Sequence, residues 1–145
     1  MIAGVTAALL AVILVFSFPA NGISAKSTIV KDCTTGRILY ERNADKRSLI
    51  ASTTKIMTAL LLAEQNTPNK WLITTKEMVT VEGSSMGLKV GDTVTYYSLL
   101  VGMLLSSGND AANTTAFALA GSNKKFAEMM NAKAAEIGMT NTHFT

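Results

Sequence analysis

The sequence has little of what many metal and redox sites need. Its 145 residues include one cysteine, Cys33, and one histidine, His143. A single cysteine excludes an intrachain disulfide bond, and we interpret Cys33 as a turn residue without chemistry. His143 has no neighbouring cysteine and no second histidine, so the sequence predicts no metal site. We also expect no cofactor.

Basic charge is sparse as well, although the formal net charge is +3. No run of basic residues is longer than a pair such as Lys124–Lys125. Nucleic-acid-binding surfaces usually carry a denser basic stripe, so we expect no nucleic-acid partner. The chain is 48% hydrophobic and 16% charged, which favours a folded core over disorder.

The N-terminal residues form the most apolar stretch of the chain. Residues 2–18 carry no charge, and Lys26 is the first charged side chain. An apolar run followed by small residues is typical of a secretory signal. No basic residue precedes the run, and about 17 residues is the lower limit of a membrane span, so a retained anchor is the alternative. We expect residues 1–25 to be a signal peptide or N-terminal anchor, and the rest to lie outside the cytoplasm.

The remaining sequence predicts a hairpin followed by helices. Two β-rich runs, 27–32 and 37–42, flank a four-residue connection that ends in Gly36, which is a hairpin signal. Capping residues and apolar periodicity predict the helices. Longer ones run from Ser52 to about Glu64, from Tyr96 to about Leu105, from Asp110 to Ala120, and from a cap at Ser122 to Gly138. A short one opens at Thr74–Glu77, whose spacing is that of a capping box beginning at Thr74. Because a lone two-stranded hairpin is not a stable sheet, residues 26–145 are expected to be an incomplete α/β (α+β) domain.

A serine and a lysine stand three residues apart at the start of the first predicted helix. Ser52 and Lys55 therefore share one helical face, among apolar neighbours. Burial and a helix N-terminus both disfavour a protonated lysine, so Lys55 could accept the proton of Ser52 as the hydroxyl attacks a substrate. The alternative is that Ser52 caps the helix while Lys55 extends to the surface. The motif alone leaves both interpretations open.

A second Ser-x-x-Lys, Ser122 to Lys125, serves as an internal control. It lies in a polar stretch before an amphipathic helix, where nothing would exclude water from the amine. We interpret Ser122 as a helix cap and Lys125 as a solvated surface residue.

Ser107-Gly108-Asn109 is the only Ser-x-Asn tripeptide in the chain. It interrupts a helical stretch and so places a hydroxyl and a carboxamide in a tight loop. Ser, Gly and Asn are also common turn residues, so an ordinary interhelical turn is the alternative when the tripeptide is considered alone.

Taken together, these motifs resemble the penicillin-binding-protein and serine β-lactamase superfamily. The sequence is most similar to the low-molecular-mass D-alanyl-D-alanine carboxypeptidases, whose second motif is also Ser-Gly-Asn. The flanking stretches 35–41, 51–58, 83–88, 107–112 and 138–144 occur in the family's order. The resemblance implies a β-lactamase/transpeptidase-like fold, in which an antiparallel sheet packs with a helical subdomain.

The resemblance also implies roles for the matching positions. Ser52 would be the acylated nucleophile and Lys55 the base that activates it. Ser107 would relay a proton to the leaving amine, and Asn109 would hold the substrate amide and support Lys55. The implied reaction removes the terminal D-alanine from peptidoglycan pentapeptides. The implied partners are the D-Ala-D-Ala stem peptide and β-lactam antibiotics, together with an association with the membrane.

The family's third motif, Lys-Thr-Gly, is absent from residues 1–145. We therefore expect residues 26–145 to be the N-terminal part of a catalytic domain, unstable and inactive alone. The alternatives are a related hydrolase (β-lactamase or D,D-endopeptidase), a non-catalytic wall-binding remnant, or a small secreted helical domain. The glycine of Ser-Gly-Asn favours the carboxypeptidase branch, because β-lactamases usually have aspartate there.

Overall fold

A computed structural model describes residues 24–145. The chain divides into two compact units, one ending at Ser48 and the other comprising Leu49–Thr145. Apart from Ser24 and Ala25, the predicted signal peptide or anchor lies outside the described residues. Within residues 24–145, no helix is both long enough and apolar enough to cross a membrane.

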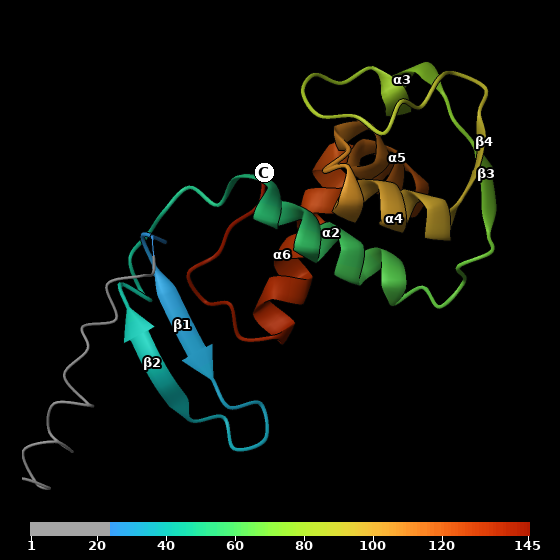
Figure 1. Cartoon of the computed structure of the whole chain (residues 1–145). Coiled ribbons are helices and arrows are strands. Elements are labelled where there is room, and N and C mark those ends of the chain that lie inside the picture. Colours follow the sequence, from blue (N-terminus) through green and yellow to red (C-terminus); the bar gives the residue numbers. More distant parts are fainter. Residues whose placement is uncertain (1–23) are drawn as a thin grey trace, which may run out of the picture. The chain divides into compact units, whose positions relative to one another are not determined.

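The first unit contains the predicted hairpin (Figure 1). Strand β1, Thr28–Lys31, pairs antiparallel with β2, Ile38–Arg42. The Asp32 carboxylate stabilises the turn by accepting hydrogen bonds from the Thr34 N–H (2.8 Å) and the Thr35 hydroxyl (2.7 Å). Gly36 closes the turn with a φ of 74°. These contacts confirm the hairpin, and Cys33 is exposed in its turn.

The second unit combines helices with a short two-stranded antiparallel sheet, which confirms a mixed α/β class. Its elements in chain order are the 3-10 helix η1 (Ala51–Thr53), α2 (Thr54–Ala63), β3 (Trp71–Ile73), α3 (Lys76–Val79), β4 (Thr93–Thr95), α4 (Tyr96–Leu105), α5 (Asn109–Ala120) and α6 (Asn123–Glu136). Helix α2 contacts α4, α5 and α6. It is therefore the central helix that the apolar sequence predicted.

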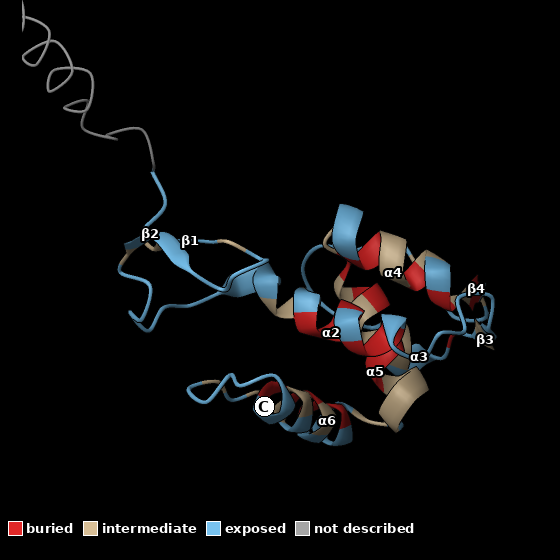
Figure 2. Cartoon of the chain, turned by 90° about the horizontal axis from the view of Figure 1, so that it is seen from below, coloured by how far each residue is buried: buried red, intermediate tan, exposed pale blue. Residues whose placement is uncertain are grey.

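Helix α2 also joins two clusters of buried side chains. One face supplies Ala59 and Leu62 to a cluster with Leu99 and Met103 of α4. The other supplies Leu61 to a cluster around Phe126 of α6. The buried residues of these helices accordingly lie on the sides that face one another (Figure 2). Burial of these apolar faces fixes where the N-terminal end of α2 lies relative to α5.

Two features of the second unit differ from the sequence-based expectation. Strands β3 and β4 were not predicted, because a three-residue strand is too short to show a periodicity. Thr75, rather than Thr74, is the N-cap residue of α3. The Thr74 side chain is buried and donates to the Lys89 carbonyl at 2.6 Å, so it is not available for capping.

The core also contains a buried hydroxyl with no partner. Thr114 and Thr115 of α5 are both fully buried. The Thr115 hydroxyl donates to the Ala111 carbonyl at 2.8 Å, whereas Thr114 Oγ1 has no hydrogen-bond partner. An unpaired buried hydroxyl costs free energy, and valine has nearly the same shape without that group.

We therefore expect Thr114→Val to raise the free energy of unfolding by about 1 kcal/mol. Thr115→Val is the matched control. It makes the same change one residue away but removes a satisfied hydrogen bond, and should give no gain. Urea unfolding of both variants measures the difference, and a Thr114→Val protein no more stable than Thr115→Val would contradict the expectation.

Candidate active site

The second unit brings the four predicted site residues into one cluster. The Lys55 amine lies 3.4 Å from Ser52 Oγ, 3.2 Å from Ser107 Oγ and 2.7 Å from Asn109 Oδ1. The two serine hydroxyls lie 2.9 Å apart. Side chains separated by more than 50 positions in the sequence thus form one hydrogen-bonded network.

Ser52 owes its position to an unusual turn before α2. The expected helix from Ser52 begins instead as the 3-10 helix η1, and α2 begins at Thr54. Ala51 has a φ of 45°, a left-handed conformation that is uncommon for a residue with a side chain. Neither η1 nor α2 has a side-chain cap hydrogen bond. The helix-cap alternative for Ser52 is therefore wrong, and its exposed hydroxyl meets Lys55 and Ser107.

The surroundings of Lys55 differ from the expected apolar pocket. Its side chain is half-buried, but three oxygens face the amine. All three oxygens lie within 3.4 Å of the nitrogen, so the amine has polar partners on several sides. Lys55 neither extends freely into solvent nor lies among hydrocarbon, because Asn109 and the two serines hold it in place.

The Ser107–Asn109 segment forms the turn between α4 and α5. Ser107 has a φ of 52°, and Gly108 is the N-cap of α5. The structure corrects one detail, since Asn109 is the first residue of α5 rather than part of a loop. The Asn109 Nδ2 group donates to the Glu82 carbonyl at 2.6 Å. This contact fixes the amide orientation, so that Oδ1 faces Lys55.

Gly108 fits because little space surrounds its Cα atom. A Cβ there would lie 2.9 Å from Asp110 Oδ1 and 3.1 Å from the Met86 nitrogen. An aspartate at this position would also bring a second negative charge beside Asp110. The geometry thus gives a physical reason for Ser-Gly-Asn in this chain.

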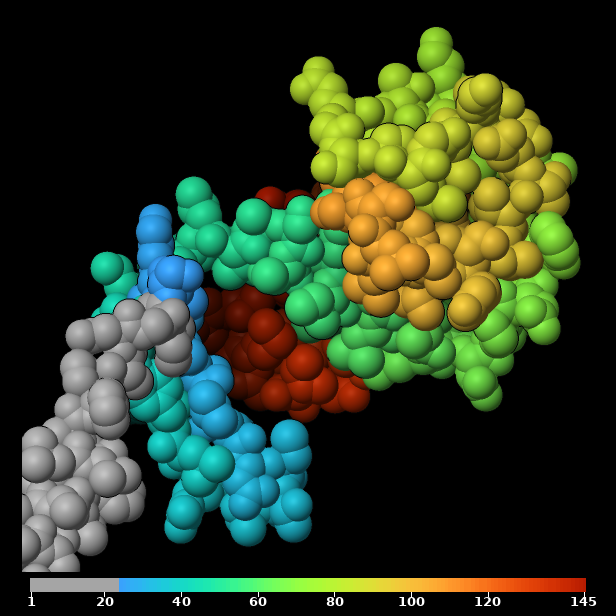
Figure 3. All heavy atoms as spheres, viewed as in Figure 1, coloured from blue at the N-terminus to red at the C-terminus, as the bar shows by residue number. Residues whose placement is uncertain are grey.

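Asp110 is a residue that sequence reasoning missed. It is 1% exposed, and its carboxylate accepts hydrogen bonds from Ser85 Oγ at 2.6 Å and from the N–H groups of Met86, Gly87 and Leu88 at 2.9, 3.0 and 2.9 Å. Figure 3 shows this yellow-green loop beside the orange end of α4. The only sequence signal was a charged residue directly after the tripeptide.

The same contacts determine how Asp110 titrates. Burial raises the pKa of the Asp110 carboxyl, but hydrogen bonds from the Ser85 hydroxyl and from the backbone N–H groups of Leu88, Met86 and Ala111 outweigh it. The pKa therefore lies below its ordinary value. Asp110 remains ionised while it holds the loop.

The internal control behaves as predicted. Ser122 caps α6 by accepting a hydrogen bond from the Lys125 backbone N–H at 3.3 Å. The Lys125 side chain is exposed. The two Ser-x-x-Lys motifs therefore differ in structure, and only the first brings its hydroxyl and amine together.

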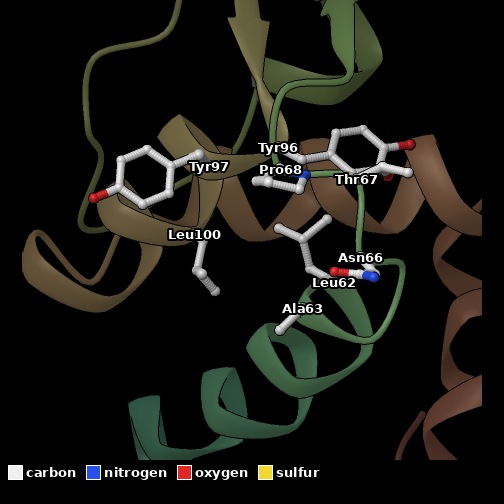
Figure 4. A pocket seen from close by; sticks show the side chains of 8 residues that line it. All are labelled: Leu62, Ala63, Asn66, Thr67, Pro68, Tyr96, Tyr97 and Leu100. Atoms are coloured by element: carbon white, nitrogen blue, oxygen red, sulfur yellow. The ribbon is translucent and has the colours of Figure 1, made fainter.

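The concave surfaces of the second unit include a pocket and a groove. A pocket of about 180 Å³ lies between the end of α2 and the start of α4 and contains none of the four site residues (Figure 4). A groove of about 250 Å³ includes Asn109, Thr58 and Phe126 in its wall and so adjoins the cluster. Among residues 24–145, no His, Cys, Asp or Glu side chains gather in a group that could hold a metal ion.

Comparison with known proteins supports one family. The family described as D-alanyl-D-alanine carboxypeptidase matches residues 15–145. The chain is 38% identical over 125 residues to the D-alanyl-D-alanine carboxypeptidase DacF of Bacillus subtilis, covering 83% of this chain and 32% of that protein. It is similar in structure to the D-alanyl-D-alanine carboxypeptidase DacD from Francisella tularensis, with a TM-score of 0.80, 36% identity, and coverage of 88% of this chain and 32% of that one. The chain thus spans about a third of the length of these relatives.

The lowered pKa of Asp110 predicts an acid-sensitive contribution to stability. A carboxyl whose pKa is lower in the folded state stabilises the fold above its unfolded pKa, and this contribution is lost as the pH falls through the folded pKa. The advantage of the wild-type protein over Asp110→Asn should therefore be largest near about pH 7 and shrink below about pH 4. Urea unfolding of both proteins across this range measures it. A stability difference that stays constant, or that grows on acidification, would contradict the lowered pKa of Asp110.

Proposed function

Since the chain belongs to the D-alanyl-D-alanine carboxypeptidase family, we propose that its protein is a serine carboxypeptidase. It removes the terminal D-alanine from peptidoglycan pentapeptides through an acyl-enzyme on Ser52. The observation that carries the proposal is the contact of one amine, Lys55 Nζ, with Ser52, Ser107 and Asn109. This geometry unites a nucleophile, a base and the groups that orient the base.

The distances suggest how the proton leaves Ser52. The direct separation between Ser52 Oγ and Lys55 Nζ is 3.4 Å, a weak hydrogen bond. The route through Ser107 has shorter separations of 2.9 and 3.2 Å. A hydroxyl can rotate to exchange donor and acceptor roles. We therefore assign Ser107 as a relay between Ser52 and Lys55, with Lys55 as the base that finally holds the proton.

The later steps use the same groups in reverse. The proton held by Lys55 passes through Ser107 to the nitrogen of the leaving D-alanine as the peptide bond breaks. Water then hydrolyses the ester on Ser52, with its proton taken up by the same network. The backbone N–H groups at the start of α2 supply positive potential for the oxyanion, and Asn109 orients Lys55 and contacts the substrate amide.

The proposed partners follow from this chemistry. A β-lactam resembles acyl-D-Ala-D-Ala and would acylate the same serine. The substrate is part of the cell wall, so we propose that the protein acts outside the cytoplasm. The apolar residues 2–18 support export and an association with the membrane. The other interpretations, a β-lactamase, a D,D-endopeptidase or a non-catalytic remnant, are not favoured by the matches.

The first test is covalent labelling of Ser52 by fluorescent penicillin. The assay uses the protein expressed from the complete reading frame that encodes this chain. Ser52→Ala should abolish labelling because it removes the attacking oxygen. Ser122→Ala, in the second Ser-x-x-Lys motif, is the matched control, and should label normally while losing about 1 kcal/mol of stability as a cap is removed. Equal labelling of Ser52→Ala and wild type would refute the proposal.

A second test concerns the amide of Asn109. Asn109→Asp would bring a negative charge to the position 2.7 Å from the Lys55 amine and favour the protonated, non-basic form of that amine. The acylation rate should fall about 10- to 1,000-fold near neutral pH and recover in part at alkaline pH. Asn113→Asp is the control, because Asn113 donates to the Glu77 and Met78 carbonyls one turn later in α5. An equal loss of acylation rate in both variants would contradict the role assigned to Asn109.

A further inference from the structure

We infer that Asp110 is a positioning residue that holds the 82–88 loop against α5, and that the loop in turn aims the Asn109 side chain at Lys55. The catalytic consequence of this inference rests on the proposed function. The mechanical part, in which Asp110 acts on Asn109 through the loop, rests on contacts within the second unit alone.

The first step is the attachment of the loop to Asp110. The loop directs the hydroxyl of Ser85 and three consecutive backbone N–H groups, those of Met86, Gly87 and Leu88, at one buried carboxylate. Residues 84–88 belong to no helix or strand, so these hydrogen bonds replace the ladder that such an element would supply. Loss of the carboxylate would remove the shared acceptor of these hydrogen bonds and so the attachment of the loop to α5.

The second step is the pair of hydrogen bonds between the loop and Asn109. The Glu82 carbonyl accepts from Asn109 Nδ2 at 2.6 Å, and the Ser84 carbonyl accepts from the Asn109 backbone N–H at 2.7 Å. Gly83, between these two carbonyls, has a φ of 91°, and a Cβ there would lie 2.7 Å from Asn109 Nδ2. The backbone therefore approaches the amide as closely as a glycine allows.

The third step connects the loop to the amine. The Glu82 carbonyl can accept but not donate a hydrogen bond, so it selects the Nδ2 end of the amide. The Oδ1 end is then left to face Lys55, which it meets at 2.7 Å. If the loop moved, the amide could rotate, and Lys55 would lose its shortest contact. A displacement of about 1 Å at a reacting group can cost roughly 100-fold in rate.

Asp110→Asn tests the whole series of contacts that runs from Asp110 through the loop and Asn109 to Lys55. Asparagine has the same shape, but one carboxylate oxygen becomes an NH₂ group that cannot accept the loop's hydrogen bonds. We expect hydrogen exchange, followed by NMR, to accelerate about tenfold or more at the Met86, Gly87 and Leu88 amides, and also at the backbone and side-chain amides of Asn109. The acylation rate constant of Ser52 should fall about 10- to 100-fold, while the fraction of protein finally labelled stays the same.

Asp92→Asn is the matched control. The Asp92 carboxylate accepts a hydrogen bond from the Lys89 N–H at 2.8 Å and takes no part in the hydrogen bonds of Asn109 and Lys55, so its substitution should leave Asn109 exchange and acylation unchanged. Ser85→Ala removes one hydrogen bond to Asp110 and decides the question if Asp110→Asn does not fold. It should shift both readouts in the same direction by a smaller factor.

The outcomes separate the inference from the proposed function. Faster exchange in the loop with unchanged exchange at Asn109 would overturn the inference, because Asp110 would then act on the loop alone. Unchanged acylation in a variant whose Asn109 amides exchange faster would overturn its catalytic part. A wild-type protein that cannot be acylated would instead refute the proposed function, and the exchange at Asn109 would still decide whether Asp110 positions it.

Discussion

The candidate site of the second unit depends on the contact between the Lys55 amine and three oxygens. These oxygens come from η1, from the turn after α4 and from the first residue of α5. The contact exists only if α2, α4 and α5 are packed correctly, and the two apolar clusters along α2 provide that packing. Hydrophobic burial thus fixes the positions of the helices. Those positions bring the ends of the helices close enough for the polar network to form.

The start of α5 supplies both a residue of the candidate site and the residue that holds the neighbouring loop in place. Asn109 contacts the amine, and the next residue, Asp110, holds the loop that contacts Asn109. Gly108 before them leaves room for the Met86 backbone and the Asp110 carboxylate. Because adjacent residues of a helix point in different directions, one turn of α5 serves the site on one side and the loop on another.

The sequence predicted the parts of the site that short motifs encode. Ser52 with Lys55, and Ser107 with Asn109, are local pairs, and the hairpin and helix caps follow from local rules. Contacts between distant residues do not follow from local rules. Those of Lys55 with Ser107 and Asn109, 52 and 54 positions away, were implied only by the family resemblance. The loop held by Asp110, 22 to 25 positions away, was missed. Strands β3 and β4 are stabilised by each other, so neither could be recognised alone.

The left-handed backbone at Ala51 and Ser107 has a consequence for the protein's evolution. Both residues have a positive φ; Ala51 precedes the proposed nucleophile, Ser52, and Ser107 is the proposed relay. Such conformations cost about 1–3 kcal/mol each and persist only where the surrounding fold enforces them. Selection for thermal robustness alone would favour substitutions that relax these turns. The same substitutions would separate the two hydroxyls, so robustness and activity place opposing demands on these two positions.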